Sequence, residues 1–323
     1  MKRTKNPAKE AEYRKRAADL VAQMTLHEKV SQMLSWAPAI ERLGIPAYNW
    51  WSEGIHGVGR AGTATVFPQA IGMAAAFDED MMEQVGNAVG VEARGKYNMC
   101  RAHGDRDIFK GLTVWAPNIN IFRDPRWGRG HETYGEDPYL TGEMGVAFVK
   151  GLQGDDPNCR KVDATLKHYA VHSGPESLRH SFDVHVEDGD LYETYLWAFK
   201  YCIDHADPSA VMGAYNRVNG EPACASETLL QKILFGEFGF EGYVVSDCGA
   251  ICDINRNHQV TANEAESAAL AVNNGCILNC GDAYKWLKTA VLLGMRPSPP
   301  AWRSCLRRGS AWACSTRTAP TTS

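Results

Sequence analysis

Polar and ionisable side chains stand where apolar runs of the chain end. Asp247 closes the run YVVSD, Lys167 and His168 lie late in DATLKHYAV, Tyr215 lies late in SAVMGAYN, and Glu53 follows IPAYNW. A fixed carboxylate near such groups can act as a nucleophile or a general base. Taken alone, Asp247 fits the N-cap of a following helix equally well.

Strand-like apolar runs alternate with longer helical patterns, which favours parallel βαβ units. The predicted strands span 45–50, 71–77, 113–121, 163–171, 209–216, 242–247 and 276–280, and the predicted helices span 78–98, 138–154, 188–206, 226–239, 261–275 and 282–294. This number of repeats favours an α/β fold of the (β/α)8 TIM-barrel type over an open doubly wound sheet. A barrel gathers the carboxyl ends of its strands at one face, where we expect the polar side chains to meet. No glycine-rich phosphate loop follows the first strand, so nucleotide binding has no local support.

Composition narrows the classes of partner. The chain has 323 residues, 44% hydrophobic and 22% charged, with a net charge of −4. This balance gives no argument for nucleic acid or a membrane as partner, and no apolar run is long enough to span a bilayer. The basic start of the chain has no apolar secretory core, so we expect a cytoplasmic protein. Of the ten cysteines, two pairs, Cys248 with Cys252 and Cys276 with Cys280, have CxxxC rather than CxxC spacing, which predicts reduced, mostly buried thiols, with no metal site and no cofactor.

Five sequence blocks resemble family 3 glycoside hydrolases, in the branch that holds bacterial β-xylosidases and β-glucosidases. The blocks are NWWSEGIHGV (49–58), FRDPRWGRGHETYGEDPYLTG (122–142), KHYAVHSGPESLRHSFD (167–183), VMGAYNRVNGEPACAS (211–226) and GYVVSDCGAI (242–251). They stand in family order, within a resemblance that runs from about residue 20 to about residue 294. Any single block would be weak evidence, whereas five in order are specific.

The resemblance implies retaining hydrolysis of terminal non-reducing β-D-xylosyl or β-D-glucosyl residues, with a β-linked oligosaccharide or glycoside as substrate. Such an enzyme forms a covalent glycosyl intermediate on a carboxylate. The family nucleophile occupies the VSD position, which is Asp247 here. Many β-glucosidase relatives have Trp after the nucleophile, where this chain has Cys248, so the choice between xylose and glucose stays open.

The resemblance also implies a set of substrate-binding side chains. These are Glu53, Arg129, Lys167, His168, Arg179 and Tyr215. Lys167 and His168 are expected to donate hydrogen bonds to sugar hydroxyls. Successive strand residues face opposite ways, so both can reach one ligand only if the strand ends or bulges there. For the neighbouring segment, a supporting ion pair between Arg123 and Asp124 is also expected.

The end of the chain departs from the family pattern. In most members of this branch, the acid/base glutamate comes from a domain after the barrel. Residues 296–323 are rich in Pro, Arg and Ser without helical order, and a shifted reading of the codons for 308–318 permits a family-like barrel ending. We therefore expect a barrel over 1–295, incomplete at its C-terminal end, a frameshifted and disordered tail over 296–323, and impaired activity.

Two other functions fit part of the pattern. A single-domain β-N-acetylglucosaminidase takes its acid/base from a His–Asp pair on a barrel loop, and His172 and His180 lie near Asp183. The loop VHSGPESLRHSFD does not resemble the corresponding loop of that group. A non-catalytic carbohydrate-binding remnant would keep Lys167 and Asp247 for affinity alone.

Overall fold

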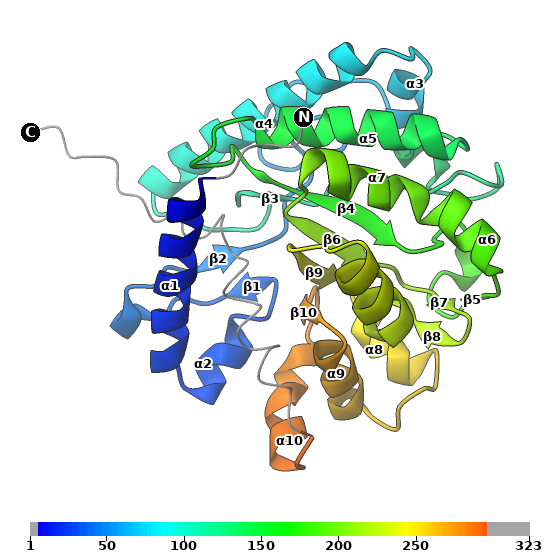
Figure 1. Ribbon diagram of the computed structural model, residues 1–323. Helices are drawn as coiled ribbons and strands as arrows, with labels where there is room; N and C mark the ends of the chain where they lie inside the picture. The colour runs from blue at the N-terminus through cyan, green and yellow to red at the C-terminus, as the bar shows by residue number, and fades with distance from the viewer. Residues whose placement is uncertain (1–5, 296–323) are drawn as a thin grey trace, which may run out of the picture.

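The computed structural model describes residues 6–295 and centres on a parallel sheet (Figure 1). Its strands are ordered β10-β9-β6-β4-β3, and neighbours in this order run parallel. The strands of the chain are β1 (Trp36–Ala37), β2 (Tyr48–Asn49), β3 (Thr113–Val114), β4 (Asp163–Tyr169), β5 (Asp183–Val184), β6 (Ala210–Gly213), β7 (Arg217–Val218), β8 (Glu221–Pro222), β9 (Tyr243–Ser246) and β10 (Cys276–Leu278). A helical segment lies between each pair of strands that are consecutive in this sheet, as βαβ connections require.

The sheet closes into a ring through its first and last strands. A parallel bridge joins Ser52 to Val114 beside β3, and another joins Leu34 to Asn279 after β10. Between these bridges, β1 and β2 pair antiparallel. The ring confirms the predicted α/β barrel, with its first two strands reduced to short segments.

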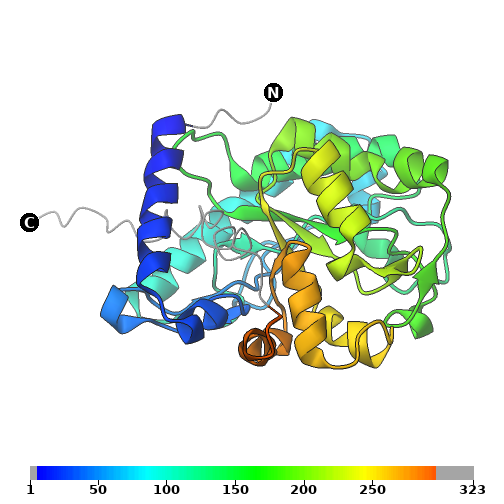
Figure 2. The same cartoon turned by 60° about the horizontal axis from the view of Figure 1, so that its bottom comes forward.

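Helices cover the outside of this ring (Figures 1 and 2). The α-helices are α1 (Pro7–Gln23), α2 (Leu26–Ser31), α3 (Ala70–Ala74), α4 (Glu79–Ala102), α5 (Pro138–Gln153), α6 (Asp188–Asp190), α7 (Trp197–Ala206), α8 (Ala250–Arg256), α9 (Glu264–Asn273) and α10 (Leu287–Leu292). Shorter or irregular helical segments are η1 (Glu41–Leu43), η2 (Gly130–Glu132), η3 (Glu176–Leu178), η4 (Leu191–Tyr195), η5 (Ala223–Ala225), η6 (Glu227–Glu237) and η7 (Ala283–Trp286). Helices α4, α5 and α7 lie side by side along one flank.

Local sequence signals set the ends of the long helices. The Asp78 carboxylate caps α4 by accepting the Met81 amide. Asp137 caps α5 in the same way, and Pro138 fills the first helical position. Ser226 caps η6, as its position in the sequence predicts. The helices predicted over 78–98, 138–154 and 226–239 are therefore confirmed.

The strand predicted over 71–77 is wrong, because this segment contains helix α3. Its buried residues are Ala70, Met73 and Ala74, which have helical spacing. A short apolar run such as IGMAAAF fits a buried helix turn as well as a buried strand, so periodicity alone does not separate the two.

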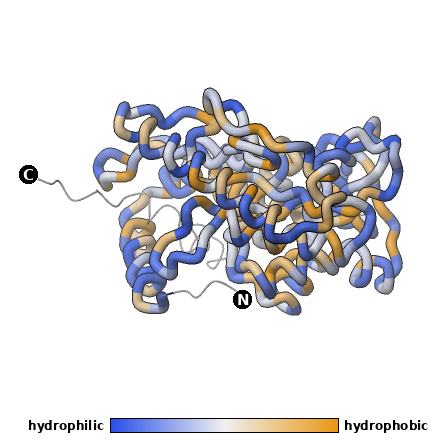
Figure 3. The backbone as a smooth tube through the Cα atoms, turned by 90° about the horizontal axis from the view of Figure 1, so that it is seen from above, coloured by the Kyte–Doolittle hydropathy of each residue, from blue (hydrophilic) through white to orange (hydrophobic). Residues whose placement is uncertain are grey.

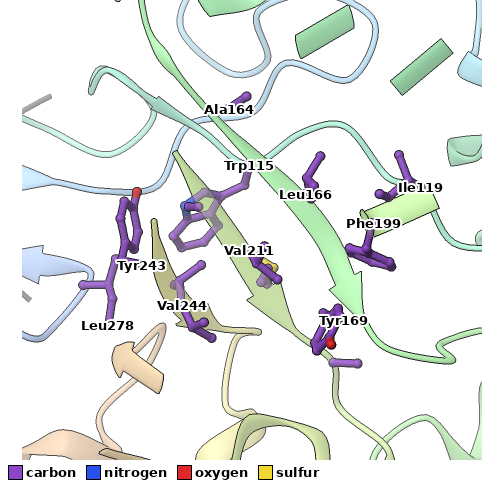
Figure 4. Packing of buried hydrophobic residues seen from close by; sticks show 14 of the residues in the cluster. Trp115, Ile119, Ala164, Leu166, Tyr169, Phe199, Val211, Tyr243, Val244 and Leu278 are labelled. Carbon is purple, nitrogen blue, oxygen red and sulfur yellow. The ribbon is translucent and has the colours of Figure 1, made fainter. Parts of the chain in front are cut away.

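The core fills both faces of the central strands (Figure 4). Leu166 on β4 and Val211 on β6 are fully buried, and Tyr169 packs edge-on against Phe199 of α7 at 5.0 Å between ring centroids. Hydrophilic stretches of the chain are frequent on the outside of the fold (Figure 3). This packing fixes the strands, and with them the residues at their carboxyl ends.

Candidate active site

Asp247 directly follows β9, at the carboxyl end of the barrel. Its carboxylate is buried, with 7% of the residue exposed. Oδ1 accepts a hydrogen bond from the Cys248 amide at 2.7 Å. Oδ2 has no hydrogen-bond partner among the described residues and lies 3.5 Å from Nε2 of His168. The strand end thus holds one carboxylate oxygen and leaves the other, also buried, beside His168.

Burial raises the pKa of Asp247 above its ordinary value. The positive charge of Arg129, the Cys248 amide, the positive charge of Lys167 and the Tyr215 hydroxyl each act in the opposite direction. Desolvation disfavours the charged form of a carboxyl group, whereas cations and donors favour it. Asp247 is therefore a poorly solvated carboxylate that surrounding donors help to keep ionised.

Lys167 and His168 both reach the site around Asp247 because β4 is irregular at their position. The register with β6 shifts between Lys167 and Tyr169. Lys167 Nζ lies 3.8 Å from the Glu53 carboxylate, and His168 lies beside Asp247. This irregularity agrees with the expectation that the strand ends or bulges here, and two successive buried side chains approach one site.

Asn120 holds His168 in a defined orientation. Asn120 Oδ1 accepts the His168 backbone amide at 2.8 Å and contacts Nδ1 at 2.9 Å, and Asn120 Nδ2 donates to the His168 carbonyl at 2.7 Å. An acceptor at Nδ1 assigns the proton to that nitrogen. Burial lowers the pKa of His168 well below its ordinary value, so the ring is neutral. Nε2 then carries a lone pair, so it can accept a hydrogen bond rather than donate one.

Arg129 and Glu132 form a bidentate pair beside the nucleophile candidate. Nε and Nη2 of Arg129 donate to the two carboxylate oxygens at 2.7 and 2.8 Å. Burial alone would raise the pKa of Glu132, but the Arg129 guanidinium reverses this and lowers it. The pair fixes the arginine fork, which suits the recognition of two adjacent hydroxyls.

Tyr215 and Arg179 complete the cluster. The Tyr215 hydroxyl donates to the Cys248 carbonyl at 3.0 Å. The Arg179 guanidinium lies over the Tyr215 ring, 5.9 Å from its centroid, and also pairs with Glu176. The structure therefore brings all the residues predicted for the site into one cluster at the carboxyl ends of the strands.

The ion pair expected between Arg123 and Asp124 does not form. Asp124 pairs with Arg126, while Arg123 lies over the ring of Tyr195, so the expected Arg123–Asp124 pair is wrong. The tight turn over 124–127 places Arg126, rather than the preceding arginine, beside the carboxylate.

The histidine–aspartate pairing near this loop also differs. His180 Nδ1 lies 2.8 Å from Asp253 on α8, whereas Asp183 lies 3.8 Å from Arg217. The acid/base pair weighed for a β-N-acetylglucosaminidase therefore does not form with Asp183. The His180 ring packs edge-on against Tyr215, at 4.5 Å between centroids.

The tryptophans near the strand ends differ in accessibility. Trp50, Trp115 and Trp127 are buried, and Trp51 is only partly buried. Trp51 stacks on Trp115 and donates from Nε1 to Glu53 at 2.7 Å. Trp51 is thus the member of this group that donates to a residue of the cluster and helps to orient it.

The cysteines after β9 and β10 are not reduced thiols. Cys248 and Cys280 form a disulfide, with Cα atoms 4.5 Å apart. Each cysteine stands two residues after its strand, and the strands are parallel neighbours. The expectation of reduced thiols is wrong here, because the pairing runs across strands rather than within either CxxxC segment. Free thiols occur at Cys100, Cys202, Cys224, Cys252 and Cys276.

Two further features concern metals and membranes. In residues 6–295, no group of three or more His, Cys, Asp or Glu side chains is arranged to hold a metal ion. No helix in this part of the chain is both long and apolar enough to cross a membrane.

A barrel with a buried carboxylate and paired cations at its strand ends is the architecture of many carbohydrate-active enzymes. The profile of the glycosyl hydrolase family 3 N-terminal domain matches residues 16–295. The chain belongs to this family.

Relatives agree with this assignment. The chain is 48% identical over 288 residues to a xylan 1,4-beta-xylosidase of Xylanibacter ruminicola, covering 87% of this chain and 33% of that protein. It is 44% identical to a probable beta-D-xylosidase 7 of Arabidopsis thaliana, covering 83% and 36%. The chain thus spans about a third of the length of these relatives.

Solved structures give the same fold. A GH3 exo-beta-xylosidase, XlnD, in complex with a xylobiose aziridine activity-based probe superposes with a TM-score of 0.86 at 34% identity, covering 95% of this chain and 41% of that one. A beta-glucosidase from Listeria innocua in complex with isofagomine gives 0.77 at 27% identity, covering 92% and 45%. Both xylosidases and glucosidases therefore share this barrel.

Proposed function

We propose that this chain carries the nucleophile and sugar-binding half of a retaining β-glycosidase that acts on terminal β-D-xylosyl or β-D-glucosyl residues. The observation that supports it most is the buried Asp247, with one oxygen held by an amide and the other facing His168. Membership of glycoside hydrolase family 3 and the named activities of its relatives point to the same reaction class.

In this reaction, Asp247 Oδ2 attacks the anomeric carbon as the bond from that carbon to the leaving-group oxygen breaks. The leaving oxygen takes up a proton, and the sugar stays on Asp247 as an ester. Water then attacks the same carbon and gives up a proton, which balances the one taken up by the leaving oxygen, while the sugar is released and the carboxylate restored. Two inversions give net retention.

The surrounding side chains divide the binding work by their chemistry. Lys167 and Arg129 donate to sugar hydroxyls, and neutral His168 accepts from one at Nε2. Glu53 accepts at a further hydroxyl, oriented by Trp51 and Lys167. Cations near Asp247 also keep it ionised for attack.

Glu132 is poorly suited to protonate the leaving group, because two hydrogen bonds from Arg129 lower its pKa. A general acid needs a raised pKa. The first test therefore uses a leaving group that departs without a proton.

The test is covalent labelling with a 2-deoxy-2-fluoro-β-xyloside and the matching glucoside, each with a dinitrophenolate leaving group. Mass spectrometry of the intact chain and its peptides should find one fluorosugar on Asp247. The faster of the two reagents indicates the preferred sugar. A label on Glu53 or Asp183, or no label with either reagent, would overturn the proposal.

Matched variants separate chemistry from binding. Asp247→Asn keeps the shape of the side chain and should abolish labelling, since an amide is a poor nucleophile. Asp183→Asn is the control, because Asp183 lies in β5 and pairs with Arg217 of β7. It should label at the parent rate. Saturable sugar binding without any covalent label would instead support a non-catalytic carbohydrate-binding protein.

A further inference from the structure

Cys248, the residue after Asp247, contacts the nucleophile candidate through its backbone. The Cys248 amide donates to Asp247 Oδ1 at 2.7 Å, and its carbonyl accepts the Tyr215 hydroxyl at 3.0 Å. Its side chain is bonded to Cys280. Any movement of Cys248 therefore changes both the hydrogen bond to the carboxylate and the position of the neighbouring phenol.

The Cys280 side of the link is held firmly to the end of β9. The Cys280 amide donates to Ser246 Oγ at 3.1 Å, and Asn279 Nδ2 donates to the same oxygen at 3.1 Å. The Cys280 carbonyl accepts the Gly249 amide at 2.8 Å. These hydrogen bonds and the disulfide form a clasp, made of residues 246–249 and 279–280, on both sides of Asp247.

Glycines give the turns on both sides of the clasp their backbone conformation. Gly249 has φ 85° and Gly281 has φ 118°, both in the region that favours glycine. A Cβ atom on Gly281 would stand 3.4 Å from the Gly249 amide nitrogen, an ordinary contact, so the backbone conformation rather than lack of space favours glycine there. The turn after β9 is thus supported by the turn after β10, whose Cys280 carbonyl accepts the Gly249 amide.

We propose that the Cys248–Cys280 disulfide is a positioning device for Asp247, and that its reduction slows attack on the anomeric carbon. This inference rests on the proposed function. The covalent link fixes Cys248 relative to β10 while its amide and carbonyl hold Asp247 and Tyr215. Misplacement of a reacting group by about 1 Å can lower a rate about 100-fold.

The link is accessible from one side. Cys248 is partly exposed, whereas Cys280 is buried, with only 3% of the residue exposed. A small dithiol can attack the Cys248 sulfur, releasing the Cys280 thiolate, which takes up a proton. The second thiol of the reagent then displaces Cys248. The protein gains two thiols, and the reagent becomes a cyclic disulfide.

The experiment compares labelling of Asp247 in the oxidised and reduced chain. Dithiothreitol is applied at a temperature where circular dichroism shows the fold intact, and alkylation with mass analysis verifies reduction of Cys248 and Cys280. The rate constant for labelling by the 2-fluoro glycoside should fall about tenfold or more. The reagent concentration at half-maximal rate should stay nearly constant, and reoxidation should restore the rate.

The double variant Cys248→Ala/Cys280→Ala should show the same loss, and dithiothreitol should have no further effect on it. The acid limb of its pH profile should move to higher pH, because loss of the Cys248 amide bond raises the pKa of Asp247. Cys252→Ser, which removes a partly buried free thiol on α8, is the matched control and should behave like the parent.

The outcomes separate the two proposals. If the oxidised parent is not labelled at Asp247, the proposed function fails. If the parent is labelled there and the verified reduced chain is labelled at the same rate, the disulfide is structural only and the positioning role is overturned. The reduced parent provides this result even if the double variant does not fold.

Discussion

Asn120 offers a direct test of how the site holds His168. In Asn120→Ala, three hydrogen bonds are lost, and all three end on His168. Both residues are buried, at 3% and 1% exposed. A buried hydrogen bond contributes about 1 kcal/mol net, so the variant should lose about 3 kcal/mol of stability. For a domain of this size, that lowers the thermal midpoint by roughly 5 °C.

The same change should affect chemistry. Without the Asn120 acceptor at Nδ1, His168 is free to carry its proton on Nε2, 3.5 Å from Asp247 Oδ2. A proton on Nε2 would be donated in a hydrogen bond to Asp247 Oδ2, the attacking oxygen. Nε2 could then no longer accept a hydrogen bond from the sugar. We expect labelling of Asp247 to slow about tenfold, a change of about 1.4 kcal/mol in the barrier.

The assay pairs differential scanning calorimetry with the labelling rate, measured on folded protein. Thr165→Val is the matched control on β4, because its buried hydroxyl has no hydrogen-bond partner among the described residues. Replacing such a hydroxyl by a methyl group is near neutral or stabilising. If Asn120→Ala has the same thermal midpoint as the parent, the argument that its three hydrogen bonds stabilise the fold is refuted. If it is destabilised but labels at the parent rate, the tautomer of His168 does not matter.

Two further predictions use the same reagents. Lys167→Ala should weaken monosaccharide binding about tenfold by calorimetric titration, with little change in thermal midpoint, since its Glu53 partner is 32% exposed and can be solvated. Unchanged affinity with a large loss of stability would contradict the binding role. The labelling rate should fall on the acid side at a pH above 3.8, the ordinary pKa of an aspartate, because the pKa of Asp247 is raised and only the ionised form attacks. A rate that stays constant down to that pH would refute this assignment.

The parts of the fold that the sequence predicts are those with local causes. The caps at Asp78 and Asp137 each depend on a few neighbouring residues, and the helices begin where these residues predict. The strand predicted over 71–77 was wrong because this apolar run is too short for the spacing of its residues to distinguish a helix from a strand. Closure of the ring by single bridges such as Ser52–Val114 depends on distant segments, and no local pattern indicates it.

The prediction of the site also succeeded where the cause was local and failed where it depended on distant segments. Motif blocks placed Asp247 and Lys167 at strand ends, and the barrel brought them together. Asn120 was missed, although it is a polar residue inside an apolar run, a signal that could have identified it. The Cys248–Cys280 link needed the register of β9 against β10, which spacing along the chain does not contain.

Two carboxylates of the cluster have pKa values that shift in opposite directions, and this difference supports the separate roles proposed for them. Glu132 has its pKa lowered by two hydrogen bonds from Arg129, so its negative charge is already compensated and its oxygens are occupied. Asp247 has its pKa raised by burial, and its Oδ2 accepts no hydrogen bond from a described residue. A nucleophile loses its charge as it forms the ester, so a poorly solvated carboxylate gains most from that step. The same Arg129 serves both groups, because it neutralises Glu132 directly and favours ionisation of Asp247 through space. The electrostatics of the cluster therefore favour attack by Asp247 and leave Glu132 to hold the arginine.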